Sequence, residues 1–149
     1  MSRATVYLAP ALVLCLGLSA ARAGTIERVS VSSSGGQGNG DSIGPAISAD
    51  GRVVAFWSNA TNLVADDTNG VDDVFVHDRL TGVTERVSVD SSGGQANDTS
   101  SGGGTSFRGR AMNSPAISAD GRFVAFTSFA CTFTCTGAGA YPGRRLWRR

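Results

Sequence analysis

The sequence predicts an all-β fold made of antiparallel four-stranded blades, which together form an incomplete β-propeller. Three observations predict this class. Long segments recur along the chain, short strand-like runs alternate with Gly, Asn and Asp turns, and long apolar helical stripes are absent. A β-sandwich built from duplicated hairpins is the alternative, but a sandwich does not need close sequence repetition.

Two segments of the chain are nearly duplicated. The stretch 27–37 recurs at 85–95, and the stretch 45–56 recurs at 115–126. The second pair is further apart along the chain than the first, and the extra residues fall within the Gly- and Ser-rich stretch 98–113. Insertions collect in such loops because they disturb no strand pairing.

Residues 1–23 are predicted to be a signal peptide. Arg3 supplies a positive charge, residues 6–18 form an apolar run, and an Ala-Arg-Ala sequence ends at Ala23. The run is shorter than the roughly 20 residues of a spanning helix, which disfavours the alternative of an uncleaved membrane anchor. We therefore expect a mature chain that begins at Gly24, is periplasmic or secreted, and has no membrane association after cleavage.

The mature chain is expected to begin with a leftover outer strand at 26–31, followed by one complete blade at 45–89. Asp50-Gly51 and Asn69-Gly70 are strong turn signals. The continuous apolar run at 53–57 is typical of a strand covered on both faces. Strands of the blade are expected at 45–48, 53–57, 74–76 and 84–89.

Only two strands of a next blade are expected, within residues 115–128. Closed propellers have typically about four to eight blades, so this chain cannot close a ring alone. We expect exposed edges at 53–57 and 123–126 to pair with other chains. The result would be a monomer that is marginally stable or aggregates, or an assembly of several copies.

Four segments carry a resemblance to a known family, and they lie at 48–56, 73–78, 81–82 and 85–87. Their Ser-Ala-Asp-Gly-Arg-Val-Val-Ala-Phe, Asp-Val-Phe-Val-His-Asp, Thr-Gly and Glu-Arg-Val sequences resemble the repeat of the TolB-like β-propellers. The resemblance covers about 25–130, so the stretch 24–130 is assigned to the repeat domain.

The resemblance implies a non-catalytic, exported binding scaffold that recognises a protein or a cell-envelope component through its loops. Two alternatives stay open. The chain could be the propeller accessory region of a secreted peptidase or hydrolase, or a non-functional fragment of a longer gene.

The repeat stops after Ala130, and residues 131–149 form a divergent tail rich in Arg and Gly. The match is lost in the middle of a blade, which favours a break in the reading frame, because atypical end units normally cap a finished repeat. The alternative is a genuine C-terminal segment with a loop between Cys131 and Cys135.

The charge distribution disfavours nucleic-acid binding. Residues 24–143 contain seven Arg, no Lys and 12 Asp and Glu, a net charge of −5. No basic stripe is present in this body, whereas phosphate backbones require clustered positive charge.

The sequence also predicts no catalytic centre. Its single histidine, His77, lies in an alternating strand pattern and is expected to be exposed or to line a groove. Nucleophilic hydrolysis needs a base beside a placed nucleophile, and no Gly-x-Ser-x-Gly elbow is present.

The acidic stretch at 66–73 is the best candidate ligand site. Its oxygen donors suit a hard cation such as calcium, which takes about six to eight oxygen ligands. The alternative is a solvated Asn-Gly hairpin turn. The candidate metal ligands are Asp66, Asp67, Asn69, Asp72 and Asp73.

Several recurring residues are expected to support the fold. Asp50 and Asp120 occupy the same turn position of the two repeats, which indicates a structural role. Arg52 and Arg122 follow those turns and could pair with neighbouring blades. Trp57 is expected to pack between blades.

Overall fold

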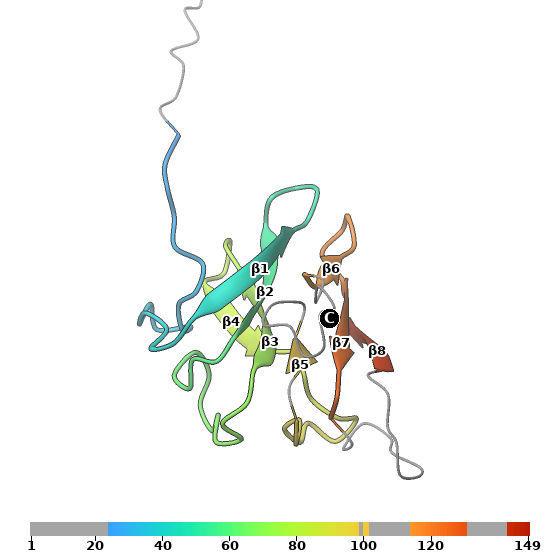
Figure 1. Cartoon of the computed structure of the whole chain (residues 1–149). Helices are drawn as coiled ribbons and strands as arrows, with labels where there is room; N and C mark the ends of the chain where they lie inside the picture. The colour runs from blue at the N-terminus through green and yellow to red at the C-terminus, as the bar shows by residue number, and fades with distance from the viewer. Residues whose placement is uncertain (1–23, 99, 102–113, 131–142) are drawn as a thin grey trace, which may run out of the picture.

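The structure is a computed structural model that describes residues 24–98, 100–101, 114–130 and 143–149. Within these ranges the chain is all-β, without a helix, and forms two antiparallel sheets (Figure 1). The predicted all-β fold class is thereby confirmed. The predicted signal peptide at 1–23 and the predicted Cys131–Cys135 loop lie outside the described residues.

The first sheet contains four strands in the order β1-β2-β3-β4. It is a meander, because each strand pairs with the next one along the chain. Each of the four strands overlaps one of those expected for the complete blade. Their bounds are β1 Ser42–Ile47, β2 Val53–Ser58, β3 Asp73–Asp78 and β4 Val83–Arg86.

The second sheet is centred on β7. Strand β8 pairs with β7 along its whole length, so the short strands β5 and β6 share the other edge of β7. The bounds are β5 Ser100–Ser101, β6 Ala116–Ile117, β7 Phe123–Ser128 and β8 Gly143–Arg148. The tail that diverges in sequence therefore contributes β8, which holds the position in this sheet that β3 holds in the first sheet.

The second sheet repeats the register of the first. In the first sheet, Val53 of β2 pairs with Asp78 of β3. In the second sheet, Phe123 of β7 pairs with Arg148 of β8, and these two residues are the equivalent positions of the second repeat. Strands β5 and β6 together take the place of β1. The extra residues of the second repeat enter where β1 has an irregularity beside Gly44, so the insertion does not disturb the pairing on either side.

A hydrophobic core fills the space between the two sheets. One face of the first sheet contributes Val53, Ala55 and Trp57, and the second sheet contributes Val124 and Phe126. The expectation that Trp57 packs between sheets is confirmed. Alternate residues of β2 belong to a second cluster on the opposite face, where Phe56 stacks near Phe75 with ring centroids 6.0 Å apart.

Three expectations were wrong. Residues 26–31 form no strand and make only a single bridge, between Val31 and Gln37. The runs at 53–57 and 123–126 are not edges, since β2 and β7 each have strands on both sides. His77 is buried, and its Nδ1 lies 2.9 Å from Thr84 Oγ1.

The recurring turns have the structural role that was predicted for them. Asp50 accepts hydrogen bonds from Ser48 Oγ (2.6 Å) and the Arg52 amide (3.0 Å), and Asp120 repeats this arrangement. Arg52, however, binds Asp78 of its own sheet and not a neighbouring blade. An ion pair between the two sheets comes instead from Arg149, whose guanidinium lies 2.6 Å from Asp78.

Candidate functional site

The acidic loop connects β2 to β3 and lies at the end of the sheets where the long connections gather (Figure 1). Ala60 and Leu63 anchor its first half because both are buried against Phe56 and Phe75. Asp66 adopts a positive φ of 61°, which turns the chain sharply. The second half of the loop leads directly into buried Asp73 at the start of β3.

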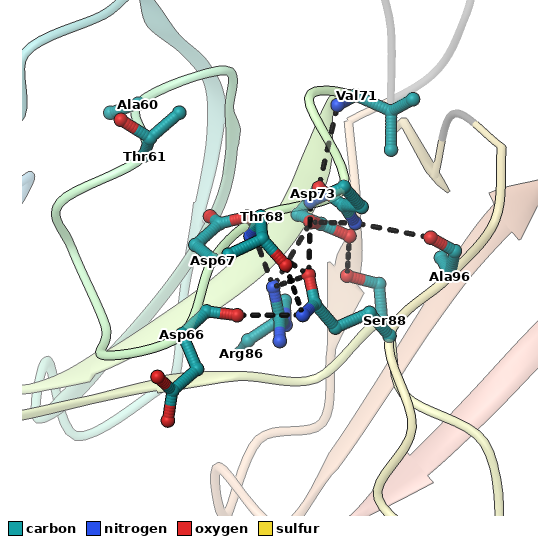
Figure 2. Close-up of polar contacts among 12 residues, drawn as sticks. Ala60, Thr61, Asp66, Asp67, Thr68, Val71, Asp73, Arg86, Ser88 and Ala96 are labelled. Atoms are coloured by element: carbon teal, nitrogen blue, oxygen red, sulfur yellow. Dashed lines mark hydrogen bonds and ion pairs between the residues drawn. The ribbon is translucent and has the colours of Figure 1, made fainter.

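A buried arginine lies at the centre of the site. The Arg86 guanidinium comes from the end of β4 and lies 3.1 Å from Asp67 and 3.5 Å from Asp73 (Figure 2). All three side chains are at least nine-tenths buried. Buried charges are tolerated only when they are paired, and the Arg86 guanidinium is paired with both carboxylates, although its Nε has no hydrogen-bond partner in the described part of the chain.

Asp73 has the most complete hydrogen bonding of the group. Its carboxylate accepts a hydrogen bond from Ser88 Oγ at 2.5 Å and one from Asn69 Nδ2 at 2.7 Å. Asn69 Nδ2 also donates to the carbonyl oxygen of Ala96 at 3.1 Å. The loop is therefore fixed to the segment that leaves β4.

Gln95 closes the loop from the side. Its Oε1 accepts hydrogen bonds from the amides of Thr68 (3.1 Å) and Asn69 (3.2 Å) and from Arg86 (3.1 Å). Its Nε2 donates to the carbonyl oxygen of Asp66 at 2.6 Å. One amide side chain thus satisfies main-chain groups that the turn would otherwise leave without partners.

The electrostatics of the site are dominated by burial. Burial raises the pKa of Asp73, Asp67 and Asp72, and the neighbouring Asp73 charge raises the pKa of the other two further. Arg86 acts in the opposite direction on Asp67 and Asp73. One arginine faces two carboxylates, so the site retains a tendency to bind a proton.

The predicted calcium ligands are only partly brought together. Asp67 and Asp73 contact Arg86, and Asn69 donates a hydrogen bond to Asp73, whereas the carboxylate of Asp66 points away from Arg86 (Figure 2). The carbonyl oxygen of Asp72 accepts a hydrogen bond from the Ser100 amide at 2.8 Å, which ties the loop to the second sheet.

The arginine occupies the position between the carboxylates that a cation would take. In the described part of the chain, no group of three or more His, Cys, Asp or Glu side chains is arranged to hold a metal ion. Calcium binding stays a prediction, and a calcium ion would have to displace the Arg86 guanidinium.

The site contains three residues that sequence reasoning missed: Arg86, Ser88 and Gln95. A signal for them was present, because all three lie in the duplicated segment 85–95. The same spacing separates Arg28 from Gln37 in the first copy of that segment. The partner of Arg86 and Gln95 could not be found from the sequence, because it lies on a separate loop earlier in the chain.

A polar cleft opens beside the acidic loop. It has a volume of ≈ 510 Å³, and its walls come from two segments, the one that precedes β1 and the loop between β2 and β3. Amide, carboxylate and hydroxyl groups dominate it, which suits hydrogen bonding to a polar partner. The residues lining it are Asn39, Gly40, Asp41, Asn59, Thr61 and Gly70.

Comparison of the chain with models of protein families and with curated proteins gave no match. In the described ranges, there is also no helix that is long and apolar enough to cross a membrane.

Proposed function

We propose that this chain is an exported, non-catalytic binding scaffold built from TolB-like β-propeller blades. The observation that carries the proposal is the repetition of register. Two sheets with the same pairing pack face to face through alternate residues of their second strands, as successive propeller blades do. The sequence features of export and of the repeat support the same conclusion.

The binding surface is assigned to the loop end that carries the polar cleft. Binding residues are commonly placed on loops held by a rigid scaffold. The loops here are held by internal bonds: Asn39 and Thr61 hydrogen-bond each other, and the Asp41 amide donates to Asn59 Oδ1 at 2.7 Å. Asp41 is exposed at this rim, so its carboxylate is available to a protein or envelope partner.

A co-sedimentation assay with isolated bacterial cell envelopes tests this proposal. The wild-type protein should sediment with the envelopes, and Asp41→Arg should reduce the bound fraction severalfold by reversing a charge at the cleft. Leu80→Arg is the matched control, because Leu80 is 74% exposed at the opposite end of the sheet. Equal binding of the two variants, or no binding by the wild type, would refute the assignment.

A further inference from the structure

The N-terminal residues of the described chain form no strand and pair with none of the described strands. Residues 24–28 are all exposed, and Ile26 has a relative exposure of 104%. Glu27 makes an ion pair with Arg79 at 2.6 Å, but both side chains are substantially exposed, so this contact holds the segment weakly.

This segment has the sequence of an outer strand. The run Glu-Arg-Val-Ser-Val at 27–31 is identical to the run at 85–89. Residues 25–28 therefore correspond to β4, which covers the outer edge of β3 in the first sheet. The corresponding edge of the second sheet belongs to β8, and no described strand covers it.

We propose that copies of this chain join head to tail, with residues 25–28 of one copy adding to β8 of another as its fourth strand. The proposal rests on the blade arrangement proposed above and not on the identity of any envelope partner. Addition of a strand to an open edge is a common mode of recognition, because it satisfies the row of unpaired main-chain groups.

A pair of side chains supports the match. In the first sheet, His77 lies opposite Thr84, and the two form a buried hydrogen bond. The corresponding residues between copies are Trp147 and Ile26. A polar pair within the chain is thus replaced by an apolar pair between chains. Trp147 already packs against the core between the sheets, and Ile26 of a second copy would extend that contact.

The donor must be a second copy. Val29 packs against the face of the first sheet that points away from the second sheet. Ser33 fixes the next residues to β4, since its hydroxyl accepts from the Thr84 amide at 2.9 Å. The first sheet therefore stands between the N-terminal segment and β8, as the arrangement in Figure 1 shows.

The joint has a defined symmetry. The two surfaces differ, so the contact is head-to-tail and repeats until a ring closes or a filament grows. Each chain supplies two blades, so closure at four to eight blades corresponds to roughly two to four copies. The joint would also place a second copy beside the exposed face that carries Ala125 and Leu146, which is 70% exposed.

Sedimentation velocity over a range of concentrations tests the joint. The Val87 amide donates to Val74 of β3, and the Thr84 amide points away to Ser33. By correspondence, the amide of Glu27 faces β8, and that of Arg28 faces away. Glu27→Pro should raise the dissociation constant about tenfold. Glu27→Ala and Arg28→Pro should leave it nearly unchanged, because both keep the Glu27 amide.

Cross-linking gives an independent readout. In a chain with its three native cysteines replaced by serine, Ile26→Cys and Trp147→Cys proteins are mixed and oxidised. A disulfide-linked dimer should form, since directly opposed residues have Cα atoms about 4.5–5.5 Å apart. The pair Ile26→Cys and Leu146→Cys is out of register and is the control.

A concentration-independent monomer, or equal cross-linking of the two cysteine pairs, would overturn the proposal. Assembly through a different surface would show as oligomers that Glu27→Pro leaves intact, and it would overturn the proposal as well. Envelope binding is measured separately with Asp41→Arg, so failure of the joint and failure of the scaffold function are distinguishable.

Discussion

Replacing Arg86 with methionine should destabilise the first sheet by about 3–5 kcal/mol at neutral pH, because it leaves a buried charge uncompensated. Arg86 separates Asp67 from Asp73, and neither carboxylate has another cation within ion-pair distance among the described residues. Methionine keeps most of the aliphatic volume. The loss therefore reports on charge and not on packing.

The loss should depend on pH with a definite sign. Burial already raises the pKa of Asp67 and Asp73, so the folded protein holds protons at a higher pH than the unfolded chain does. Without Arg86, both pKa values rise further. The loss of stability is therefore largest above these pKa values and shrinks as the pH falls through them.

Urea unfolding followed by tryptophan fluorescence measures the effect, since Trp57 lies between the sheets. The matched control is Arg79→Met, which breaks an exposed pair and should cost less than about 1 kcal/mol. Adding Asp67→Asn to Arg86→Met should restore part of the stability, because one of the facing charges is then removed. The reasoning is refuted by a loss below about 1 kcal/mol, or by a loss that is the same at about pH 5 and about pH 7.5.

Four further predictions concern the fold and the site. Gln95→Ala should cost about 0.5–1.5 kcal/mol by removing its hydrogen bonds to the main chain of the acidic loop, whereas Gln37→Ala, at an exposed position, should be nearly neutral in the same urea assay. Arg52 lowers the pKa of Asp78, so their pairing contributes to folding stability fully above the usual carboxyl pKa of about 4, and this contribution is lost as the pH falls below that value. Asp78→Asn should therefore make the free energy of unfolding less dependent on pH in acid. The indole N–H of Trp57 is buried without a partner, so Trp57→Phe should change the melting temperature little, whereas Trp57→Ala should cost about 3–5 kcal/mol. Calorimetric titration with millimolar calcium should give heat if Asp67, Asn69 and Asp73 bind the ion, and the absence of heat and of stabilisation rejects calcium.

The first sheet could be predicted because its signals are local. Asp50-Gly51 fixes a tight turn, and the apolar run at 53–57 fixes a central strand, which became β2. Strand β8 could not be predicted, since Gly-Arg-Arg-Leu-Trp-Arg shares no pattern with the sequence of β3. Its place is set by the free edge of β7, and such long-range pairing leaves no mark in the segment itself.

The absence of the strand predicted at 26–31 has the same physical origin. The stretch 27–31 is identical to one that contributes to β4, yet it forms no strand, because a strand is stabilised by the edge it joins. The acidic site shows the converse. Its carboxylates were predicted as a group, but the sequence did not show that Arg86 pairs with Asp67 and Asp73, or that Gln95 binds Arg86 and the main chain of the loop, a set of contacts that we call the clasp.

That clasp sets the strength expected of a joint between copies. In the first sheet, the outer strand β4 is held by its pairing with β3. It is also held by Arg86 and Gln95, which bind the acidic loop. The equivalent stretch of the second repeat, at 136–143, contains no Asp or Glu. Arg28 and Gln37 of an incoming copy would therefore find no carboxylate there, and the joint would depend on main-chain pairing and the Ile26–Trp147 contact. A joint without this clasp should be weak and readily reversible.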